Sequence, residues 1–288
     1  MWMCGAHAQQ YIEKSSYHLA LVSEHRLLRG ASLNSAVLAM KAQGWRMVAS
    51  PATLKYVQGS GGTAVLSKAT LQVGRGAMPE YAGAATMHNH RFWTSQVLKL
   101  RGCDVLLVAP YLLNGVGPAA QNLDAIQALC AHVGAFEIPF VAAGDWNMTP
   151  EELASTGILH HLRATIVRPK NLEWTCKIGS RRLLDFVVVS ARFAEAIAEV
   201  QGDMQAPFAT HQALKFGIKR RPRQIFTLQL IKPLAPATEP STVPWSRHRQ
   251  EASAKVAQQM EHIVAQHPAA NTQLFASLGD DAWAPTAA

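Results

Sequence analysis

Short apolar runs that fit buried β-strands recur up to about residue 218, and they constrain the fold more than any other feature of the chain. Most of these runs show no alternation with polar residues, which is typical of strands covered on both faces. Two helices are predicted between the runs. One covers residues 33–41, and the other is indicated by apolar residues at spacings of three and four, which form a stripe expected to pack on a sheet. The sequence therefore predicts an α/β fold. The runs are His18–Val22, Gly62–Leu66, Val105–Ala109, Phe140–Ala143, Phe186–Val189 and Leu214–Ile218, and the stripe is Leu123, Ile126, Leu129, Cys130 and Val133.

The pattern changes after Ile218. A basic run, Lys219–Arg223, leads into a segment with several prolines, which is typical of a linker. From Arg247 onward a helical pattern returns and then gives way to small and polar residues. We expect one domain at residues 1–218, a linker at 219–246 and a helical segment with a flexible tail at 247–288.

Composition and charge narrow the classes of function. Hydrophobic residues make up 49% and charged residues 16%, which excludes a disordered or fibrous chain. No apolar stretch reaches the ~18 residues of a membrane helix, and no secretory signal is visible, so we expect an intracellular protein, nuclear or cytoplasmic, with no membrane partner. The four cysteines lack CxxC spacing and are expected to be reduced thiols. The net charge of +8 suits a polyanion such as nucleic acid, and no obligate protein partner is evident.

An Asp-x-Asn pair follows one of the apolar runs directly. Phe140–Ala143 is followed by Gly144, Asp145 and, two residues further, Asn147. On an extended backbone Asp145 and Asn147 point the same way, and together they offer a carboxylate and an amide able to position a water. The alternative is a strand-to-helix turn in which one of them caps a helix beginning near Pro150.

Two further carboxylates border apolar runs. Glu24 comes just after His18–Val22, and carboxylates from neighbouring strands form the oxygen-rich pocket that Mg²⁺ prefers. The alternative for Glu24 is a solvated loop residue. Asp185 opens Phe186–Val189, where an unpaired carboxylate would be costly to bury. His211 is its candidate partner, as an imidazole oriented near a scissile phosphate; the alternative is a structural histidine.

Tyr111 and Asn114 follow Val105–Ala109 and complete the set of polar residues at strand ends. Their hydroxyl and amide are candidate donors to phosphate oxygens. The alternative is a turn closed by an aromatic side chain.

Taken in chain order, these polar residues resemble the motifs of the endonuclease/exonuclease/phosphatase superfamily, which has the DNase-I-like fold. The closest resemblance is to the endonuclease domains of non-LTR retrotransposons, and it covers about Tyr17 to Ile218. Gly144–Asn147 is similar to the family's Gly-Asp-Phe-Asn, and Leu183–Ser190 to its Leu-Asp-Tyr-hydrophobic-Ser segment. Less specific matches are Ser23-Glu24 to Gln-Glu, Gly61–Leu66 to a Gly-Gly strand, and Tyr111–Asn114 to Tyr-x-x-Asn.

The resemblance implies a four-layer sandwich of two mainly antiparallel β-sheets flanked by helices, with the site at one end. It also implies a DNA endonuclease that uses Mg²⁺, or Mn²⁺ in its place. The residues would share the work as follows: metal binding by Glu24 and Asp145; activation of the attacking water by Asp145 with help from Asn147; phosphate binding by Tyr111, Asn114 and His211; and orientation of His211 by Asp185.

Two departures from the family pattern keep other functions open. The family's Ser-Asp-His is here Ala209-Thr210-His211, so a neutral hydroxyl replaces a carboxylate. The family's first strand, which carries an active-site Asn, is missing before the Glu24 strand. One alternative is therefore a catalytically degenerate protein that retains the fold or nucleic-acid binding, and another is a phosphatase of small phosphate esters. His88-Asn89-His90 spells another nuclease name but lacks further ligands, and we expect no metal there.

Overall fold

The computed structural model describes residues 6–55, 58–76, 92–179, 181–208 and 210–219, together with Ala254 and Gln258, which are helical. The chain divides into two units, residues 1–226 and 227–288. The sheets and helices below belong to the first unit. The proline-containing linker, most of the segment 247–288 and His88–His90 lie outside the described residues, so the predicted domain boundaries stay a prediction.

The larger sheet has six strands, in the spatial order β10-β11-β9-β8-β7-β6. Neighbouring strands are antiparallel except β8 and β9, which are parallel. The strands are β6 (Val73–Arg75), β7 (Trp93–Leu100), β8 (Cys103–Pro110), β9 (Phe140–Asp145), β10 (Ala164–Val167) and β11 (Asp185–Ser190).

A smaller antiparallel sheet has the order β1-β5-β2, so that the strand preceding Glu24 is at its edge. Two hairpins, β3–β4 and β12–β13, form two-stranded sheets of their own. These strands are β1 (Leu19–Ser23), β2 (Trp45–Ser50), β3 (Thr53–Lys55), β4 (Gln58–Ser60), β5 (Thr63–Lys68), β12 (Gln201–Asp203) and β13 (Ala213–Lys215).

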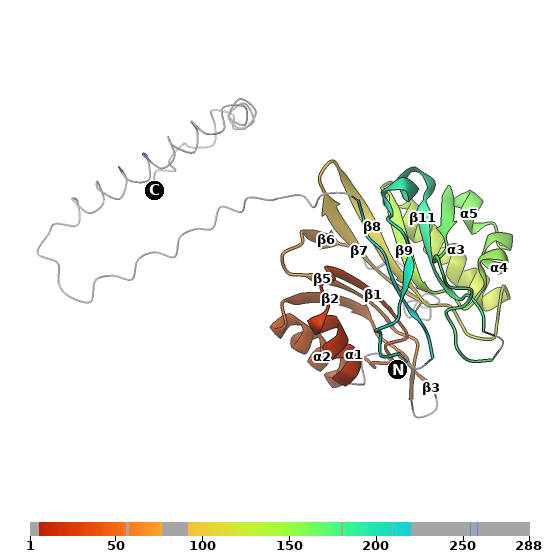
Figure 1. The fold of residues 1–288 in the computed structure, drawn as a ribbon, viewed down its shortest axis with the longest axis horizontal. Coiled ribbons are helices and arrows are strands. Elements are labelled where there is room, and N and C mark those ends of the chain that lie inside the picture. The colour runs from red at the N-terminus through yellow and green to blue at the C-terminus, as the bar shows by residue number, and fades with distance from the viewer. Residues whose placement is uncertain are drawn as a thin grey trace, which may run out of the picture. The chain divides into compact units, whose positions relative to one another are not determined.

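Helices cover the outer faces of the two sheets and complete four layers (Figure 1). Ile12 and Met40 pack with the outer face of the smaller sheet, and Leu129, Leu153 and Ile158 pack with the outer face of the larger sheet. The predicted four-layer sandwich is confirmed. The helices are α1 (Ala6–Lys14), α2 (Ala31–Ala42), α3 (Ala120–Gly134), α4 (Pro150–Ser155), α5 (Ile158–His161) and the 3-10 helix η2 (Ala191–Ala196).

Strand β9 shows why the apolar runs do not alternate with polar residues. Phe140 and Ala142 face the layer of α3 to α5, whereas Val141 and Ala143 face the core between the sheets. All four side chains are buried. A strand covered on both sides removes apolar surface from water on both faces, so every position favours an apolar residue.

Each of the six predicted strands overlaps an observed strand, although the last is shorter, Ala213–Lys215. The predicted helices are confirmed as α2 and α3, but Leu123 is 39% exposed and lies outside the buried stripe of α3. Among the longer strands, β2, β7 and β10 were not among the predicted runs. Cys103, Cys130 and Cys176 are free thiols, as expected. Among the described residues, no helix is both long and apolar enough to span a membrane.

Candidate active site

The strand register brings the predicted polar residues to one end of the larger sheet. Because β8 and β9 are parallel, Tyr111, just after the end of β8, lies beside Asp145, the last residue of β9. Because β11 is antiparallel to β9, its first residue, Asp185, lies directly opposite Asp145. Residues that are 34 and 40 positions apart in the sequence therefore meet through backbone pairing alone.

Asp145 is 5% exposed and is held by its neighbours on the chain. The backbone N–H and the side-chain amide of Asn147 donate to its two carboxylate oxygens, both at 3.0 Å. The Asn147 amide also donates to the carbonyl oxygen of Leu112 at 2.7 Å. Asn147 thus fixes the carboxylate, with a backbone φ of 49° that Asn tolerates better than most residues.

Asp185 and His211 form a hydrogen-bonded pair next to Asp145. The Nδ1 of His211 lies 2.8 Å from Oδ2 of Asp185, and its Nε2 lies 4.0 Å from Oδ2 of Asp145. Burial alone would lower the pKa of His211, but the hydrogen bond and charge of Asp185 outweigh it, and the charge of Asp145 adds to them. The pKa is raised to about 9, so His211 is a cation at neutral pH.

Burial, together with repulsion from Asp185, raises the pKa of Asp145 well above its ordinary value. A carboxylate in this position is a stronger base than a solvated one, and a cation would relieve the cost of ionising it.

The donor set fits a divalent cation. Ligand atoms of Asp145, Asp185 and His211 lie within 4.8 Å of one another. Carboxylate oxygens are the ligands that Mg²⁺ and Mn²⁺ prefer. A protonated imidazole has no free lone pair for a metal, so the two carboxylates are the better ligands of this group at neutral pH.

Glu24 lies outside this group of three and has its own neighbours. The guanidinium of Arg26 pairs with Oε1 of Glu24 at 3.0 Å. The hydroxyl of Tyr111 interacts with the same carboxylate, and the pKa of Tyr111 is raised by burial and then by the charges of Glu24 and Asp145. Tyr111 therefore lies between the two predicted metal ligands.

Several solved structures resemble this arrangement of sheets and helices. The endonuclease domain of the telomere-specific non-LTR retrotransposon TRAS1 superposes with a TM-score of 0.53 at 15% identity, over 77% of this chain and 96% of that domain. The catalytic domain of Xenopus laevis APE2 has a TM-score of 0.55 at 10% identity, with 75% and 88% covered. The Leishmania major AP endonuclease LMAP has a TM-score of 0.53 at 16% identity, with 74% and 81% covered. The chain has a DNase-I-like fold. No protein-family model and no curated protein matches the sequence.

Within this DNase-I-like fold, most of the predicted site residues come together. Asp145, Asn147, Asp185 and His211 are linked by the contacts above, and Tyr111 joins them to Glu24. Asn114 is different: its side chain is exposed on the turn after Tyr111, and no hydrogen bond among the described site residues involves it.

Ser23 was named from the sequence only within a motif match, and the contacts by which buried and half-buried residues support the site from below were not predicted. Ser23 joins the two sheets, since its hydroxyl donates to the carbonyl of Pro110 at 2.7 Å and accepts from the backbone N–H of Asp145 at 3.1 Å. Gly144 permits this approach, because a Cβ there would lie 2.6 Å from the Ser23 hydroxyl. The close packing at Gly144 explains why a glycine precedes the carboxylate.

His25 supports the turn that carries Glu24. Its Nδ1 accepts from the backbone N–H of Leu27 and its Nε2 donates to the carbonyl of Ser50, both at 3.0 Å. Burial lowers its pKa to about 4, so it stays neutral. Gly62 is required beside it, because it has a φ of 83° and a Cβ there would lie 2.6 Å from the imidazole ring. The position of His25 next to Glu24 could have drawn attention to it, but its buried hydrogen bonds cannot be predicted from the spacing of residues in the sequence.

Thr175 joins the segments that hold Asp185 and His211. Its buried hydroxyl accepts from the backbone N–H groups of Leu184 at 3.0 Å and Asp185 at 2.8 Å. Its carbonyl accepts from the backbone N–H of Gln212 at 2.7 Å. Thr175 lies in the irregular segment between β10 and β11, where no pattern in the sequence marked it.

We expect Thr175→Val to lower the free energy of unfolding by about 1–3 kcal/mol, because two buried N–H groups lose their acceptor. Urea denaturation followed by fluorescence measures the change. Thr175→Ser keeps the hydroxyl and is the matched control, expected to lose much less. If Thr175→Val lost no more stability than Thr175→Ser, the two hydrogen bonds to the hydroxyl would contribute little to the fold.

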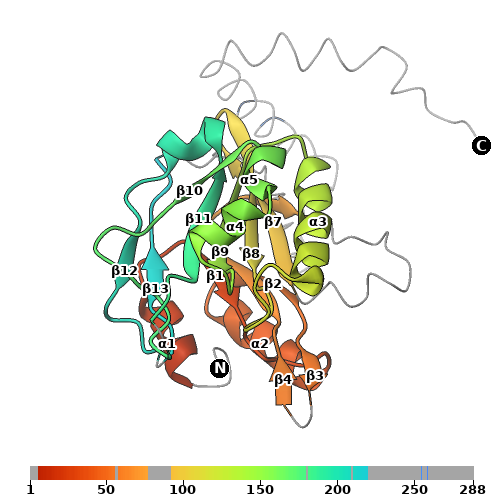
Figure 2. The ribbon, with the colours of Figure 1, turned by 90° about the vertical axis from the view of Figure 1, so that its right-hand side faces the viewer.

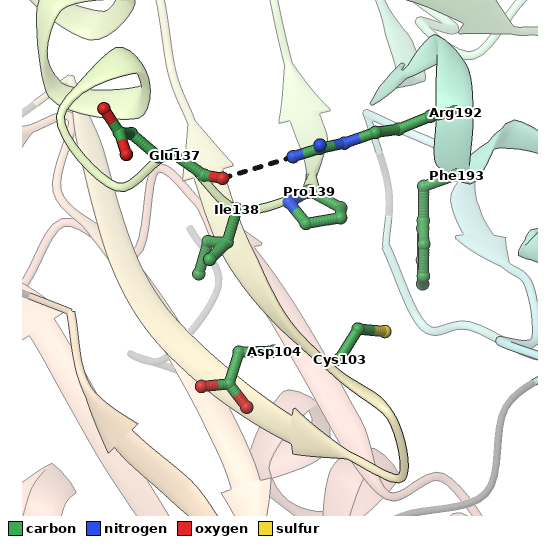
Figure 3. Close-up of a pocket in the computed structure, with 7 residues that line it drawn as sticks. All are labelled: Cys103, Asp104, Glu137, Ile138, Pro139, Arg192 and Phe193. Atoms are coloured by element: carbon green, nitrogen blue, oxygen red, sulfur yellow. Dashed lines mark hydrogen bonds between the residues drawn. The ribbon is translucent and has the colours of Figure 1, made fainter.

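A cavity of about 390 Å³ lies away from this site, at the other end of β8 (Figure 3). Arg192 reaches across it to the carbonyl of Glu137, at 3.3 Å. The site residues follow Pro110 at the end of β8, whereas this cavity borders Cys103 at its beginning. It therefore has no part in the chemistry described above. Its lining is Cys103, Asp104, Glu137, Ile138, Pro139, Arg192 and Phe193.

Proposed function

We propose that the chain is a divalent-metal-dependent phosphodiester hydrolase, and that it acts on DNA as an endonuclease. The observation that carries the proposal is the cluster of Asp145, Asp185 and His211 at one end of a DNase-I-like sandwich. These are the residue types that phosphodiester hydrolysis needs: a carboxylate base, a cation and oxygen ligands for a metal.

Asp145 is assigned as the base that orients or deprotonates the attacking water. Its raised pKa suits proton abstraction near neutral pH, and the two hydrogen bonds from Asn147 keep its oxygens in place. Asn147 therefore acts by positioning Asp145 and the water.

His211 is assigned as the cationic contact to the phosphate, with Asp185 as the carboxylate that orients it. The imidazolium offers Nε2–H on the side facing Asp145, while Nδ1–H is engaged by Asp185. A fixed cation stabilises the negative charge that develops on phosphate oxygens. Tyr111 is assigned as a further donor, and Asn114 as a donor that would have to turn inward from its exposed position.

Mg²⁺ or Mn²⁺ would be held by Asp145 and Glu24, as the resemblance implies, with Asp185 as a further oxygen ligand close to Asp145. The ion would neutralise the phosphate and lower the pKa of a bound water. For Glu24 to serve, its carboxylate would have to share or leave the ion pair with Arg26.

DNA is proposed as the substrate on charge and on structural similarity. The net charge of +8 favours a polyanion over a small metabolite. The neighbours with similar folds are named as endonucleases, and a further one, the 3′ phosphatase NExo from Neisseria, was solved with a product DNA hairpin at a TM-score of 0.50 and 17% identity. We place such a protein inside the cell, in the nucleus or cytoplasm.

The test is nicking of supercoiled DNA by the purified full chain with Mg²⁺ or Mn²⁺. Metal-dependent conversion to open circles, stopped by EDTA and weakened by added salt, is the expected result. A folded chain that leaves DNA intact but hydrolyses a small phosphate ester, independently of salt, would replace the proposal by a small-molecule phosphatase.

A catalytically degenerate protein is the second candidate, and two observations favour it. Thr210 is a neutral residue beside His211, and Glu24 is already engaged by Arg26. If the wild type is silent on both kinds of substrate, Thr210→Asp tests whether a restored carboxylate brings activity back. Salt-sensitive DNA binding without cleavage would support this second candidate.

A further inference from the structure

A buried carboxylate outside the site, Asp203, ties the N-terminal segment to the hairpin that follows His211. Asp203 ends β12 and is 5% exposed. The hydroxyls of Tyr11, in α1, and Tyr17, just before β1, both donate to its Oδ2. The backbone N–H of Gln205 donates to Oδ1 at 3.1 Å. Burial would raise the pKa of Asp203, but these hydrogen bonds outweigh it and lower the pKa, so the carboxylate stays ionised at neutral pH.

The backbone of Asp203 leads directly to the site. Its carbonyl oxygen accepts a hydrogen bond from the side-chain amide of Gln212, the residue after His211. The backbone N–H of Gln212 in turn donates to Thr175, whose hydroxyl accepts from the N–H of Asp185. Asp203 is thus connected by three successive contacts to the Asp185–His211 pair.

The hairpin has few paired residues of its own, and packing of Leu214 and Phe216 on the core between the sheets also supports it. Strands β12 and β13 have three residues each, and two-stranded hairpins of this size are marginal by themselves. Among the described strands, β13 pairs in its sheet only with β12, and β1 only with β5. No backbone hydrogen-bond ladder among these strands therefore joins β1 to the hairpin, although α1 lies next to the hairpin (Figure 2). The ring of Tyr11 adds an edge-on contact with Phe208, with 5.7 Å between centroids.

We propose that Asp203 is a positioning residue for His211, and that Tyr11 and Tyr17 are the clamp that fixes it. Two phenol–carboxylate hydrogen bonds do the work that strand pairing does elsewhere in the two sheets. The consequence for catalysis rests on the proposed function, whereas the clamp itself does not.

The test is the double variant Tyr11→Phe with Tyr17→Phe, which keeps both rings and removes both hydroxyls. Amide hydrogen exchange at Gln212 should accelerate by about tenfold or more, because the segment opens locally more often. Amides in the centres of β9 and β11, such as those of Ala142 and Val188, should be unchanged. With cleavable DNA, kcat should fall about tenfold with KM nearly unchanged, since small displacements of a catalytic group cost rate rather than binding. Unchanged exchange at Gln212 would overturn the proposal, whatever the activity.

A triple variant that adds Asp203→Asn separates positioning from stability. It removes the charge that the double variant leaves buried without its two phenol donors, so we expect the melting temperature to recover partly. The clamp predicts that Gln212 exchange and kcat stay impaired in the triple variant. Full recovery of both would reduce Asp203 to a structural role and contradict the proposal. Asp104→Asn, which breaks the ion pair with Lys99 far from the site, is the matched control and should leave both readouts at wild-type values.

The same experiments distinguish failure of the clamp from failure of the proposed function. If the wild type cleaves no phosphodiester, the kinetic readout is lost, but amide exchange at Gln212 still tests whether the clamp holds the segment. If the double variant does not fold, Tyr17→Phe alone keeps one of the two bonds, and exchange there should lie between the wild-type and unfolded values. Wild-type exchange in that single variant would then contradict the proposal.

Discussion

Replacing Asp145 by Asn is expected to lower metal-dependent DNA cleavage by about three orders of magnitude or more, because in the proposed mechanism one carboxylate serves both as base and as metal ligand. Asn has the same shape and keeps an oxygen for the backbone N–H of Asn147, which now lies 3.0 Å from Oδ1. The fold should therefore survive. Single-turnover nicking of supercoiled DNA at saturating Mg²⁺ measures the loss.

A thermal readout checks the metal role without relying on activity. Binding at about 100 times the dissociation constant stabilises a protein by roughly 2.7 kcal/mol, or several degrees in melting temperature for a domain of this size. We expect Mg²⁺ or Mn²⁺ to raise the melting temperature of the wild type and not that of Asp145→Asn. Asp124→Asn changes an exposed carboxylate on α3 and is the matched control for both readouts. Cleavage by Asp145→Asn at near the wild-type rate would remove Asp145 from the mechanism.

The parts of the fold that sequence patterns predicted are those in which burial leaves a continuous apolar run. Strands β8, β9 and β11 are covered on both faces, so nearly every residue in them is buried and apolar. Strand β2 was not predicted because it lies at the edge of its sheet and the residues between its buried ends, Trp45 and Ser50, are exposed or only partly buried. Strand β7 is buried but was also not predicted, because the polar residues Thr94–Gln96 interrupt its apolar pattern. Leu123 was placed on the inner stripe because its spacing fits, but spacing alone does not fix where a stripe ends.

For the site, strand ends determine where three of the predicted residues lie. Asp145, Asp185 and Tyr111 are fixed by the register of three paired strands, so residue type and strand boundary were enough. Asn114 lies beyond the strand on an exposed turn. Its match to the Tyr-x-x-Asn motif therefore did not predict its position correctly. Thr175 lies in an irregular segment whose contacts depend on the whole fold, which no local pattern encodes.

The Asp203 clamp could not be predicted for a related reason. Its partners Tyr11 and Asp203 are 192 positions apart and belong to elements that share no sheet. Such contacts form only after the sheets are in place, so they leave no periodic signal in the sequence. Contacts of this kind are therefore not visible in the sequence.

Asp185→Asn is expected to change how the stability of the metal-free chain depends on pH. In the folded chain Asp185, with a smaller contribution from Asp145, raises the pKa of His211 from 6.5 to about 9. A raised pKa stabilises the fold fully below the unfolded value near 6.5, and this contribution is lost as pH rises through 9. At about 1.36 kcal/mol for each pKa unit, the shift corresponds to roughly 3 kcal/mol at most. The raised pKa of Asp145 has the same sign, so the wild type should lose stability as pH rises.

Urea denaturation at several pH values between 6 and 10, in EDTA, measures this contribution. The wild type should be more stable than Asp185→Asn near pH 6, and the gap should narrow towards pH 10, because His211 is then neutral in both proteins. An NMR titration of the histidines identifies the group directly: the signal that titrates near pH 9 should move towards 6.5 in the variant. A gap that stays constant with pH would mean that Asp185 supports the fold through its hydrogen-bond geometry and not through the charge of His211. In that case the imidazolium would lose its assigned role as the cation facing the phosphate.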